Sequence, residues 1–269
     1  MRIRIRHTTT YTYDQPVEYA SQLMRLTPSE HAGQRIRSWR VTADGRLLAR
    51  TDDGYGNTIH LCTVSKAHQN AVIVAEGEVE TADTQGVLRD AIERLPPRYW
   101  VRATAPTAPD DALRALAHEV ERVAEPVPRL HRLMELIRAR VDCVAGKTTV
   151  TTTAAEALAK GSGVCQDHAH VFIAVAHLLD IPARYVSGYL LRPGGETAPS
   201  SHAWAEAHLP KVGWIGFDAA NNLCPTENYV RVAVGLDYNE AGPIRGVRRG
   251  LAGEEMAVAV DVKPAQAQQ

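Results

Sequence analysis

The sequence of 269 residues lacks several features that would assign it to a class at once. It has no run of about eighteen consecutive apolar residues, so no membrane-spanning helix is predicted. Neither charge predominates, because 30 lysines and arginines against 31 aspartates and glutamates leave a formal net charge of −1. No basic stripe with interleaved aromatic residues occurs, which argues against nucleic acid as a partner. The first residues alternate arginine with isoleucine, which is typical of a strand and unlike the apolar stretch of a secretory signal.

Cysteine is also scarce, and its spacing is informative. The four cysteines, Cys62, Cys143, Cys165 and Cys224, are far apart and form no C-x-x-C pair. Closely spaced pairs are the usual source of zinc ligands, and no calcium-binding loop pattern is present, so we expect no metal and no cofactor. Scattered cysteines in a chain of this length are typical of reduced thiols. We therefore expect a cytoplasmic protein without a disulfide framework.

The first 82 residues predict a β-rich domain. Segments rich in threonine, tyrosine and isoleucine alternate in polarity and are separated by turns that contain glycine and aspartate. Five strands are expected, at residues 2–13, 36–41, 46–50, 58–64 and 71–80. Several short strands at this spacing favour a small N-terminal β-sandwich.

Helices become frequent after a proline-rich stretch, and the predicted class is α+β. Residues 83–110 contain several prolines that break regular elements, and we interpret them as a surface linker between domains. A core at 111–235 follows, and then a C-terminal extension at 236–269 with a disordered tail from 266. Helices are expected at 112–123, 129–141, 154–159 and 165–179, and strands at 185–191, 202–209, 213–218 and 256–262.

The helix predicted at 165–179 carries the strongest functional signal. Its apolar residues cover almost the whole circumference, so it is expected to be buried in the centre of the core. Cys165 stands in its first turn, where unpaired backbone N–H groups and the helix dipole favour thiolate over thiol and can stabilise an oxyanion. Gly161 and Gly163 before it leave room for a substrate over the sulfur. The other three cysteines lack this setting and are interpreted as packed thiols.

A reactive thiol requires a histidine base, and the base requires a group that orients it. Side-chain alternation places His202 and Asp218 on defined faces of their predicted strands. If the hairpin turns about Pro210, His202 lies directly opposite Asp218 and the two side chains point the same way. A one-residue slip in register would separate them. The alternative base, His208, lies at the turn end of its strand, where it is expected to be more exposed.

A metal site is the second interpretation of the same residues. His168 follows Cys165 by three residues, so a zinc ion held by Cys165, His168 and His202 is the alternative arrangement. No H-x-x-x-H or H-E-x-x-H pattern occurs, and His168 and His170 point to different faces of the helix. We therefore favour the thiol nucleophile.

Four blocks of sequence together resemble the bacterial transglutaminase-like proteins, a family described as cysteine proteases. The blocks are GVCQDHAH at 163–170, IPARYVSGY at 181–189, SHAW at 201–204 and GWIGFD at 213–218. The β-rich start of the chain also resembles the N-terminal region that accompanies this core, so the resemblance covers nearly the whole chain. Ala219-Ala220 stand where the family commonly has Pro-Thr, and Leu236 stands where it usually has arginine.

The resemblance implies a papain-like, transglutaminase-like core of helices packed on an antiparallel sheet. It implies Cys165 as nucleophile, His202 as general base and Asp218 as the group that orients the base. The implied chemistry is acyl transfer through a thioester, on a peptide or protein substrate with an amide acyl donor, by a cysteine peptidase or amidase. The alternatives are a transamidating transglutaminase, an amide-forming or trimming enzyme of a bacterial peptide pathway, and a catalytically silent scaffold.

Four further residues are candidates for substrate contact. Gln166 and Asp167 belong to the block around Cys165, and Asp167 either contacts substrate or fixes the loop. Tyr189 and Trp204 are candidates for the lining of the cleft, although aromatic side chains beside an active site are as often packing residues. The sequence does not choose between water and an amine as the acceptor.

Overall fold

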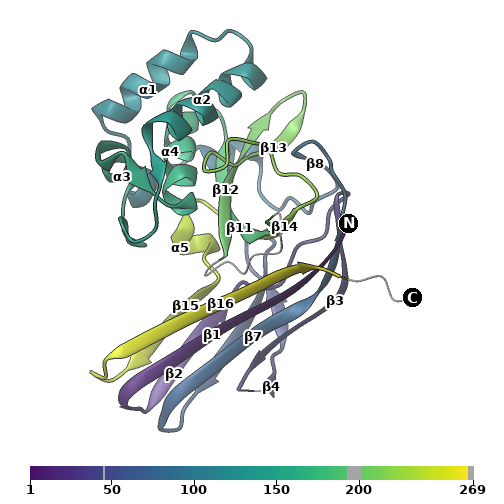
Figure 1. The fold of residues 1–269 in the computed structure, drawn as a ribbon, viewed down its shortest axis with the longest axis vertical. Coiled ribbons are helices and arrows are strands. Elements are labelled where there is room, and N and C mark those ends of the chain that lie inside the picture. The colour runs from purple at the N-terminus through teal and green to yellow at the C-terminus, as the bar shows by residue number, and fades with distance from the viewer. Residues whose placement is uncertain (45, 193–200, 266–269) are drawn as a thin grey trace.

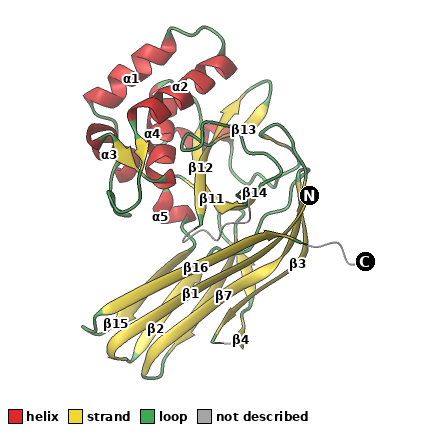
Figure 2. Ribbon diagram, in the orientation of Figure 1, coloured by secondary structure: helices red, strands yellow, loops and turns green. Residues whose placement is uncertain are grey.

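The computed structural model describes residues 1–44, 46–192 and 201–265. Long strands extend from one end of the molecule, and helices gather around a shorter sheet at the other end (Figure 1). Figure 2 shows the same division by type of structure. No helix in these ranges is both long and apolar enough to cross a membrane. The predicted tail from 266 lies outside the described residues.

Two sheets form the end with the long strands. The first has the strand order β16-β1-β7-β3-β4 and the second has the order β15-β2-β6-β5. Their strands are β1 (Arg2–Val17), β2 (Tyr19–Met24), β3 (Gln34–Ala43), β4 (Arg46–Leu47), β5 (Arg50–Asp52), β6 (Thr58–Val64), β7 (His68–Thr81), β15 (Ile244–Arg249) and β16 (Glu254–Pro264). Apolar side chains from both sheets meet in one buried cluster that includes Tyr11, Met24, Val41 and Ile73. The two sheets form the expected β-sandwich.

The sandwich differs from the sequence prediction in two respects. The single strand expected at 46–50 is two strands, because β4 pairs with β3 in the first sheet and β5 pairs with β6 in the second. The C-terminal residues are not an extension, since β15 pairs with β2 and β16 pairs with β1 from Ile3↔Pro264 to Tyr13↔Glu254. Pairing between segments so far apart depends on tertiary context and leaves no local pattern in the sequence.

The long strand β1 contributes to two cores. Ile3 and Ile5, near its start, pack with Tyr189 and Val230 of the helix-containing part. Further along the strand, Tyr11 belongs to the sandwich core. These residues share one face because side chains alternate along a strand with a period of two. β1 therefore ties the sandwich to the helix-containing part through apolar contacts.

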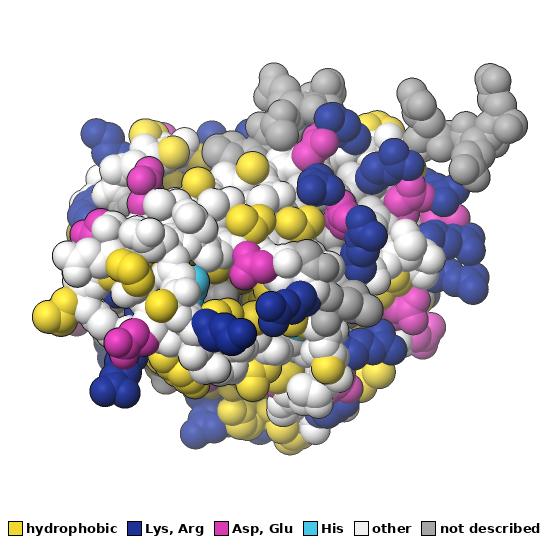
Figure 3. All heavy atoms as spheres, turned by 90° about the horizontal axis from the view of Figure 1, so that it is seen from below, with side chains coloured by type: hydrophobic (Ala, Val, Ile, Leu, Met, Phe, Trp, Pro, Cys, Tyr) yellow, Lys and Arg dark blue, Asp and Glu magenta, His cyan; other side chains and the backbone are white. Residues whose placement is uncertain are grey.

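The opposite face of β1 is charged and electrically balanced. Arg4 donates to Glu78 at 2.6 and 3.0 Å, and Arg6 pairs with Glu76 on the neighbouring strand β7. On the face of the molecule drawn in Figure 3, lysine and arginine are interspersed with aspartate and glutamate. Exposed ion pairs contribute little to stability because water and salt screen them. The buried face of the strand therefore holds the sheet in place.

The second part of the molecule packs helices on a sheet of order β14-β11-β12-β13-β8. The strands are β8 (Val87–Leu88), β11 (Ala183–Leu190), β12 (His202–Leu209), β13 (Gly213–Phe217) and β14 (Tyr229–Gly235), and all pairs are antiparallel. The helices are α1 (Asp111–Glu121), α2 (Pro126–Arg140), α3 (Ala154–Lys160), α4 (Cys165–Leu178), α5 (Tyr238–Ala241) and the 3₁₀ turns η1 (Pro97–Val101) and η2 (Ala105–Thr107). A short parallel pair, β9 (Asp142–Cys143) and β10 (Ser162–Gly163), lies beside α4. This is the predicted α+β arrangement.

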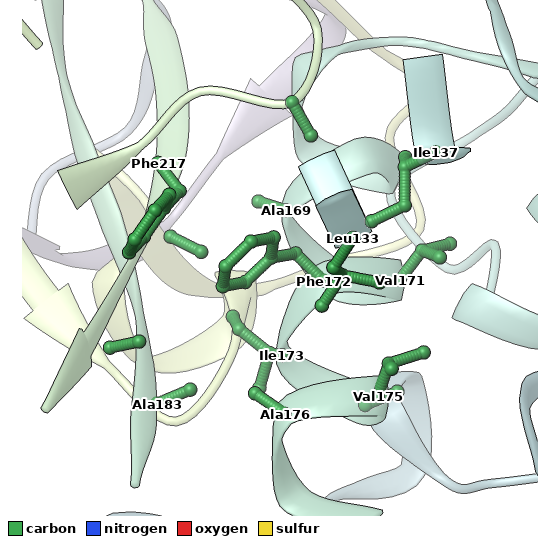
Figure 4. Close-up of a cluster of buried hydrophobic side chains, with 14 of the residues drawn as sticks. Leu133, Ile137, Ala169, Val171, Phe172, Ile173, Val175, Ala176, Ala183 and Phe217 are labelled. Carbon is green, nitrogen blue, oxygen red and sulfur yellow. The ribbon is translucent and has the colours of Figure 1, made fainter. Parts of the chain in front are cut away.

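Helix α4 lies at the centre of this part. Every residue from Gln166 to Ala176 is buried. Phe172 stacks on Phe217 of β13 with the ring centroids 5.0 Å apart. Figure 4 shows Phe172 pointing from α4 toward Phe217, while Val171 and Val175 lie on the other side of the helix. The helix is enclosed on all sides, as its apolar circumference predicts.

Residues 83–110 are not the surface linker that the sequence suggested. β8 extends the core sheet by pairing with β13, and Trp100 in η1 is only 1% exposed. The rings of Trp100 and Trp214 meet edge to face with centroids 6.1 Å apart. Arg184 of β11 donates to both carboxylate oxygens of Glu93 at 2.7 Å. Prolines shape this segment, but its aromatic and charged side chains fix it against the sheet.

Replacing Trp100 tests whether this segment belongs to the core. Trp100→Ala should lower the free energy of unfolding by about 3–5 kcal/mol, because it removes a buried ring and leaves a cavity. The indole N–H of Trp100 has no partner among the described groups, so Trp100→Phe should cost clearly less. Urea unfolding followed by circular dichroism measures both variants. A loss below about 1 kcal/mol in Trp100→Ala would show that the segment behaves as a surface linker.

Candidate active site

Cys165 is the first residue of α4, as the sequence predicted. Val164 precedes it in an extended conformation at the N-cap position. The first N–H groups of a helix, here those of Cys165 and Gln166, have no acceptor within the helix. These donors and the positive end of the helix dipole face the place where a thiolate or an oxyanion would form. The Cys165 side chain is half-buried and borders a cleft.

The glycines before Cys165 shape the backbone and do not make room for a substrate. A side chain on Gly163 would come within 2.7 Å of the Asp167 side chain. The Asp167 carboxylate folds back there and accepts the N–H of Val164 and the hydroxyl of Thr148, both at 2.7 Å. Gly161 ends α3 in the left-handed conformation, with a φ of +63°. Asp167 therefore fixes the start of the helix, which was one of its two predicted roles.

His202 and Asp218 come together through a register that differs from the predicted one. The hairpin closes at Leu209↔Gly213, so its turn is centred on Lys211 and not on Pro210, and Gly213 takes a φ of +93°. His202 is therefore diagonal to Asp218 and not directly opposite it. A displacement of two residues keeps both side chains on the same face, since side chains alternate along a strand. Nε2 of His202 lies 2.6 Å from Oδ2 of Asp218.

The Asp218 carboxylate is fully buried and accepts five hydrogen bonds. Oδ2 accepts from Nε2 of His202 at 2.6 Å and from the Asn221 amide and the Tyr229 hydroxyl, both at 2.7 Å. Oδ1 accepts the backbone N–H groups of Ala220 at 3.1 Å and Asn221 at 3.2 Å. Burial alone would raise the pKa of Asp218, but the hydrogen bond and charge of His202, with the other side-chain donors, lower it. Asp218 is therefore held as a carboxylate.

Sequence reasoning did not identify Asn221 and Tyr229. Asn221 belongs to a tight turn closed by backbone hydrogen bonds between Asp218 and Leu223. An aspartate that accepts the N–H groups two and three residues further on is a local pattern, so this signal was present in the sequence. The departure from the family pattern at Ala219-Ala220 falls in the same turn. Tyr229 begins β14 and reaches Asp218 only through the fold.

His202 lies between Asp218 and Cys165. Burial alone would lower the pKa of His202, but its hydrogen bond with Asp218, its interaction with the Cys165 thiol and the charges of both groups raise it to about 10. Because Nε2 is occupied by Asp218, Nδ1 is the ring nitrogen left for the thiol. A protonated imidazole is therefore stabilised from both sides. The alternative base, His208, packs against an aromatic ring of β13 and takes no part in this arrangement.

A second buried charge cluster anchors β12, the strand of His202. Glu206 accepts Nε of Arg231 at 2.8 Å and Nε of Arg184 at 2.7 Å. Burial alone would raise the pKa of Glu206, but the two guanidinium groups outweigh it and lower the pKa to about 2. Arg184 comes from β11 and Arg231 from β14. The cluster therefore fixes β12 relative to two other strands of the sheet.

Cys165 and His202 border a cleft with a volume of about 310 Å³. Its walls come from both parts of the molecule, because β16 of the sandwich lies against the helix-containing part at this point. Residues that line the cleft include Cys143, Tyr189, Arg192, Asn221, Val260 and Val262. Asp218 stands behind His202 and does not face the cleft.

Of the four residues predicted to contact substrate, one lies in the cleft wall. Tyr189 lines the cleft, although its hydroxyl is hydrogen-bonded to a histidine of β1. Trp204 is buried and packs edge to face on a tyrosine of β14, so it is a packing residue. Gln166 is buried, and its amide donates to a backbone carbonyl of the preceding loop at 3.2 Å. Like Asp167, it serves the local structure.

The alternative metal interpretation does not fit the geometry. Both ring nitrogens of His168 lie 2.9 Å from backbone carbonyl oxygens, those of Val164 and Val141. The ring is fully buried and held in this position, so it does not face Cys165 and His202 as a common ligand. Across residues 1–44, 46–192 and 201–265, no group of three or more His, Cys, Asp or Glu side chains has the geometry to hold a metal ion.

The buried pair of His202 and Asp218 predicts how the stability of the protein depends on pH. The pKa of His202 is about 10 against an ordinary 6.5, so its contribution to the free energy of unfolding is fully present below pH 6.5 and is lost as the pH rises to about 10. The pKa of Asp218 is lowered from 3.8, so its contribution is present above that pH and is lost in more acidic solution. The stability difference between the protein and His202→Gln should therefore be largest between about pH 4 and 6.5 and shrink toward pH 10.

Urea unfolding at stepped pH values measures this difference. His208→Gln, on the same strand, is the control. The pKa of His208 is lowered by burial, so this variant should show no change in the difference above pH 6.5. A difference for His202→Gln that stays constant from about pH 6 to 10 would contradict the prediction.

One solved structure and two relatives in sequence match this chain over nearly its whole length. A crystal structure from Cytophaga hutchinsonii, described as a "Putative Cysteine Protease", is 20% identical, covers 100% of this chain and 92% of that chain, and gives a TM-score of 0.78. An uncharacterized protein of Mycobacterium leprae is 28% identical over 97% of this chain and 98% of its own length. An uncharacterized protein of Mycobacterium tuberculosis strain H37Rv is 29% identical over 98% of this chain and 93% of its own length.

Family models divide the chain much as the structure does. Residues 3–80 match the bacterial transglutaminase-like N-terminal region, and this match extends from β1 into β7 of the sandwich. Residues 114–219 match the transglutaminase-like superfamily, and this match contains Cys165, His202 and Asp218. The sequence blocks, the fold and both matches agree. The chain belongs to the bacterial transglutaminase-like proteins, with an N-terminal region of that type joined to a transglutaminase-like core.

Proposed function

We propose that the protein is a thiol acyl-transfer enzyme that hydrolyses peptide or glutamine-type amides through a thioester on Cys165. The observation that carries this proposal is the line of Cys165, His202 and Asp218 at the edge of the cleft, with the carboxylate fully buried behind the imidazole. A nucleophile, a base in contact with it and a third group that orients the base are what such chemistry requires. Membership of the transglutaminase-like superfamily supports a thiol-dependent enzyme.

The reaction proceeds in two halves. In the first, the sulfur of Cys165, whose proton has passed to His202, bonds to the carbonyl carbon, and the π electrons of the carbonyl move to its oxygen. The oxyanion faces the N–H groups at the start of α4. When it collapses, the C–N bond breaks, the amine takes the proton from Nδ1 of His202, and a thioester remains. In the second half His202 removes a proton from water, the oxygen attacks the thioester, and the thiolate leaves.

Asp218 acts through His202 in both halves. Its contact with Nε2 turns Nδ1 toward the thiol, and its charge stabilises the imidazolium that exists between the two proton transfers. Asn221 and Tyr229 in turn hold the carboxylate, so they are positioning residues. The low pKa of Asp218 keeps the proton on the imidazole and not on the carboxylate.

Product masses test the reaction type. The full chain is incubated with glutamine-containing peptides, with and without a primary amine, and the products are read by mass spectrometry. We expect hydrolysis, seen as cleavage or deamidation, and Cys165→Ala should abolish it. Cys62→Ala, a substitution in the sandwich, is the matched control and should retain activity. Product formation by Cys165→Ala at the rate of the unmodified protein would exclude the thioester route, and amine incorporation without hydrolysis would make the reaction a transamidation.

Substitution of the buried carboxylate tests the role of the third group. Asp218→Asn should lower kcat on the order of 10²–10⁴-fold, because an amide neither fixes the tautomer nor offsets the imidazolium charge. Tyr229→Phe keeps the ring and removes one donor to Asp218, so it should lower kcat by roughly tenfold or less. Steady-state kinetics across pH measures both. A change below about threefold in Asp218→Asn would show that His202 needs no orienting carboxylate.

A further inference from the structure

Arg192 is a charged residue of the cleft that the chemistry above does not use. It follows β11 by two residues, and its side chain is exposed and lines the cleft together with Cys165 and His202. No carboxylate of the described residues forms a salt bridge with it. By contrast, Arg184 of the same sheet is fully buried between two carboxylates. Among the described residues, Arg192 is therefore a cation of the cleft that is not paired with a carboxylate.

The described walls of the cleft contain no aspartate or glutamate. Asp218 is buried behind His202, and its two oxygens already accept five hydrogen bonds. The cationic groups of the cleft are Arg192 and the imidazole of His202, whose pKa is raised to about 10. Asp218 offsets the charge of the imidazolium, so Arg192 is the cation of these described walls with which no carboxylate of the described residues pairs.

The charge of Arg192 reaches one thiol of the cleft, that of Cys143. Desolvation and the charge on Cys165 raise the pKa of the neighbouring Cys143 thiol, and Arg138 and Arg192 oppose that rise. Cys143 lies beside Gly163 in the short β9–β10 pair, close to the start of α4. A charge that acts on one thiol of the cleft also acts on an anion bound near the other.

Another part of the cleft wall is apolar. Val260 and Val262 of β16 line it, together with the ring of Tyr189. These side chains are almost fully buried in the contact between sandwich and core. The cleft therefore offers an apolar wall, a nucleophile and a cation, which suits a donor with an aliphatic stem and a negative end.

We propose that Arg192 forms an anion-binding subsite, so that the preferred acyl donors carry a carboxylate close to the scissile carbonyl. A guanidinium binds a carboxylate through two parallel N–H···O bonds, which gives both affinity and orientation. The carboxylate has two possible sources, an acidic side chain or the free terminal carboxylate of a donor attached through its side chain. This assignment of substrate class rests on the proposed acyl-transfer function, but the subsite is testable without it.

Alkylation of Cys165 by two small probes tests the subsite. Iodoacetate carries a carboxylate and iodoacetamide an amide of nearly the same size, and with either one the thiolate displaces iodide. The rate ratio of iodoacetate to iodoacetamide cancels changes in thiol reactivity that are common to both. Arg192→Gln should lower this ratio by roughly three- to tenfold, and Arg192→Glu should lower it further. Peptide mapping by mass spectrometry reads labelling at Cys165 separately from Cys143.

A matched substitution separates the local effect from net charge. Arg114→Gln removes one exposed arginine from α1, which does not line the cleft, and it should leave the ratio unchanged. Raising the salt concentration should weaken the effect of Arg192→Gln, because the interaction is electrostatic. A ratio that changes by less than about 1.5-fold in both Arg192→Gln and Arg192→Glu would overturn the subsite.

Peptide donors then identify which carboxylate is recognised. One pair differs by glutamate against glutamine next to the scissile bond, and a second pair differs by a free against an amidated terminal carboxyl group. If Arg192→Gln weakens the preference for the carboxylate form in one peptide pair, that pair identifies which carboxylate Arg192 binds. A preference that is unchanged in both pairs counts against a substrate subsite. If no donor is turned over by any form of the protein, the proposed acyl transfer fails while the alkylation ratio still decides the subsite.

Discussion

The complete burial of α4 is the constraint on which the active-site end of the molecule depends. A helix that is apolar around its whole circumference must be enclosed, and here other helices cover one side while the sheet covers the other. Only the ends of such a helix can reach the surface. Cys165 is the first residue of α4, so enclosing the helix delivers a thiol, with free backbone donors behind it, to the edge of the core. The apolar circumference of α4 therefore determines both the packing of this part and the position of the candidate nucleophile.

Buried charges then fix the strand that faces this thiol. Asp218 and Glu206 both lie in the interior, where an uncompensated carboxylate would cost several kcal/mol. Glu206 is compensated by two arginines of neighbouring strands, and Asp218 by the turn that follows it, by Tyr229 and by His202. The need to satisfy Asp218 is therefore what holds His202 in place. The hydrogen bonds to Asp218 therefore stabilise the buried carboxylate and also orient His202 as the base.

The sandwich takes part in the cleft. β1 starts the chain and β16 nearly ends it, and the two pair along their length. This pairing carries Val260 and Val262 to the cleft wall, which they share with residues that follow the strands of the core sheet. The sandwich therefore contributes its last strand, β16, to the wall of the active site and is not a detached module. Its contribution is apolar shape, whereas the core sheet contributes the charged and reactive groups.

The sequence by itself determined the elements whose signal is local. The period of two along β1, the apolar circumference of α4 and the identity of Cys165, His202 and Asp218 were all readable, because each depends on neighbours in the chain. The tertiary structure decided the rest. It set the hairpin register, and the predicted register was wrong by two residues. The pairing of His202 with Asp218 was nevertheless predicted correctly, because a shift of two residues keeps side chains on the same face. It also brought Tyr229 to the carboxylate, buried Trp100 within a supposed linker, and returned β15 and β16 to the sandwich. These contacts join segments distant in the chain, and their choice depends on the free energy of the whole packed structure, which no local pattern records.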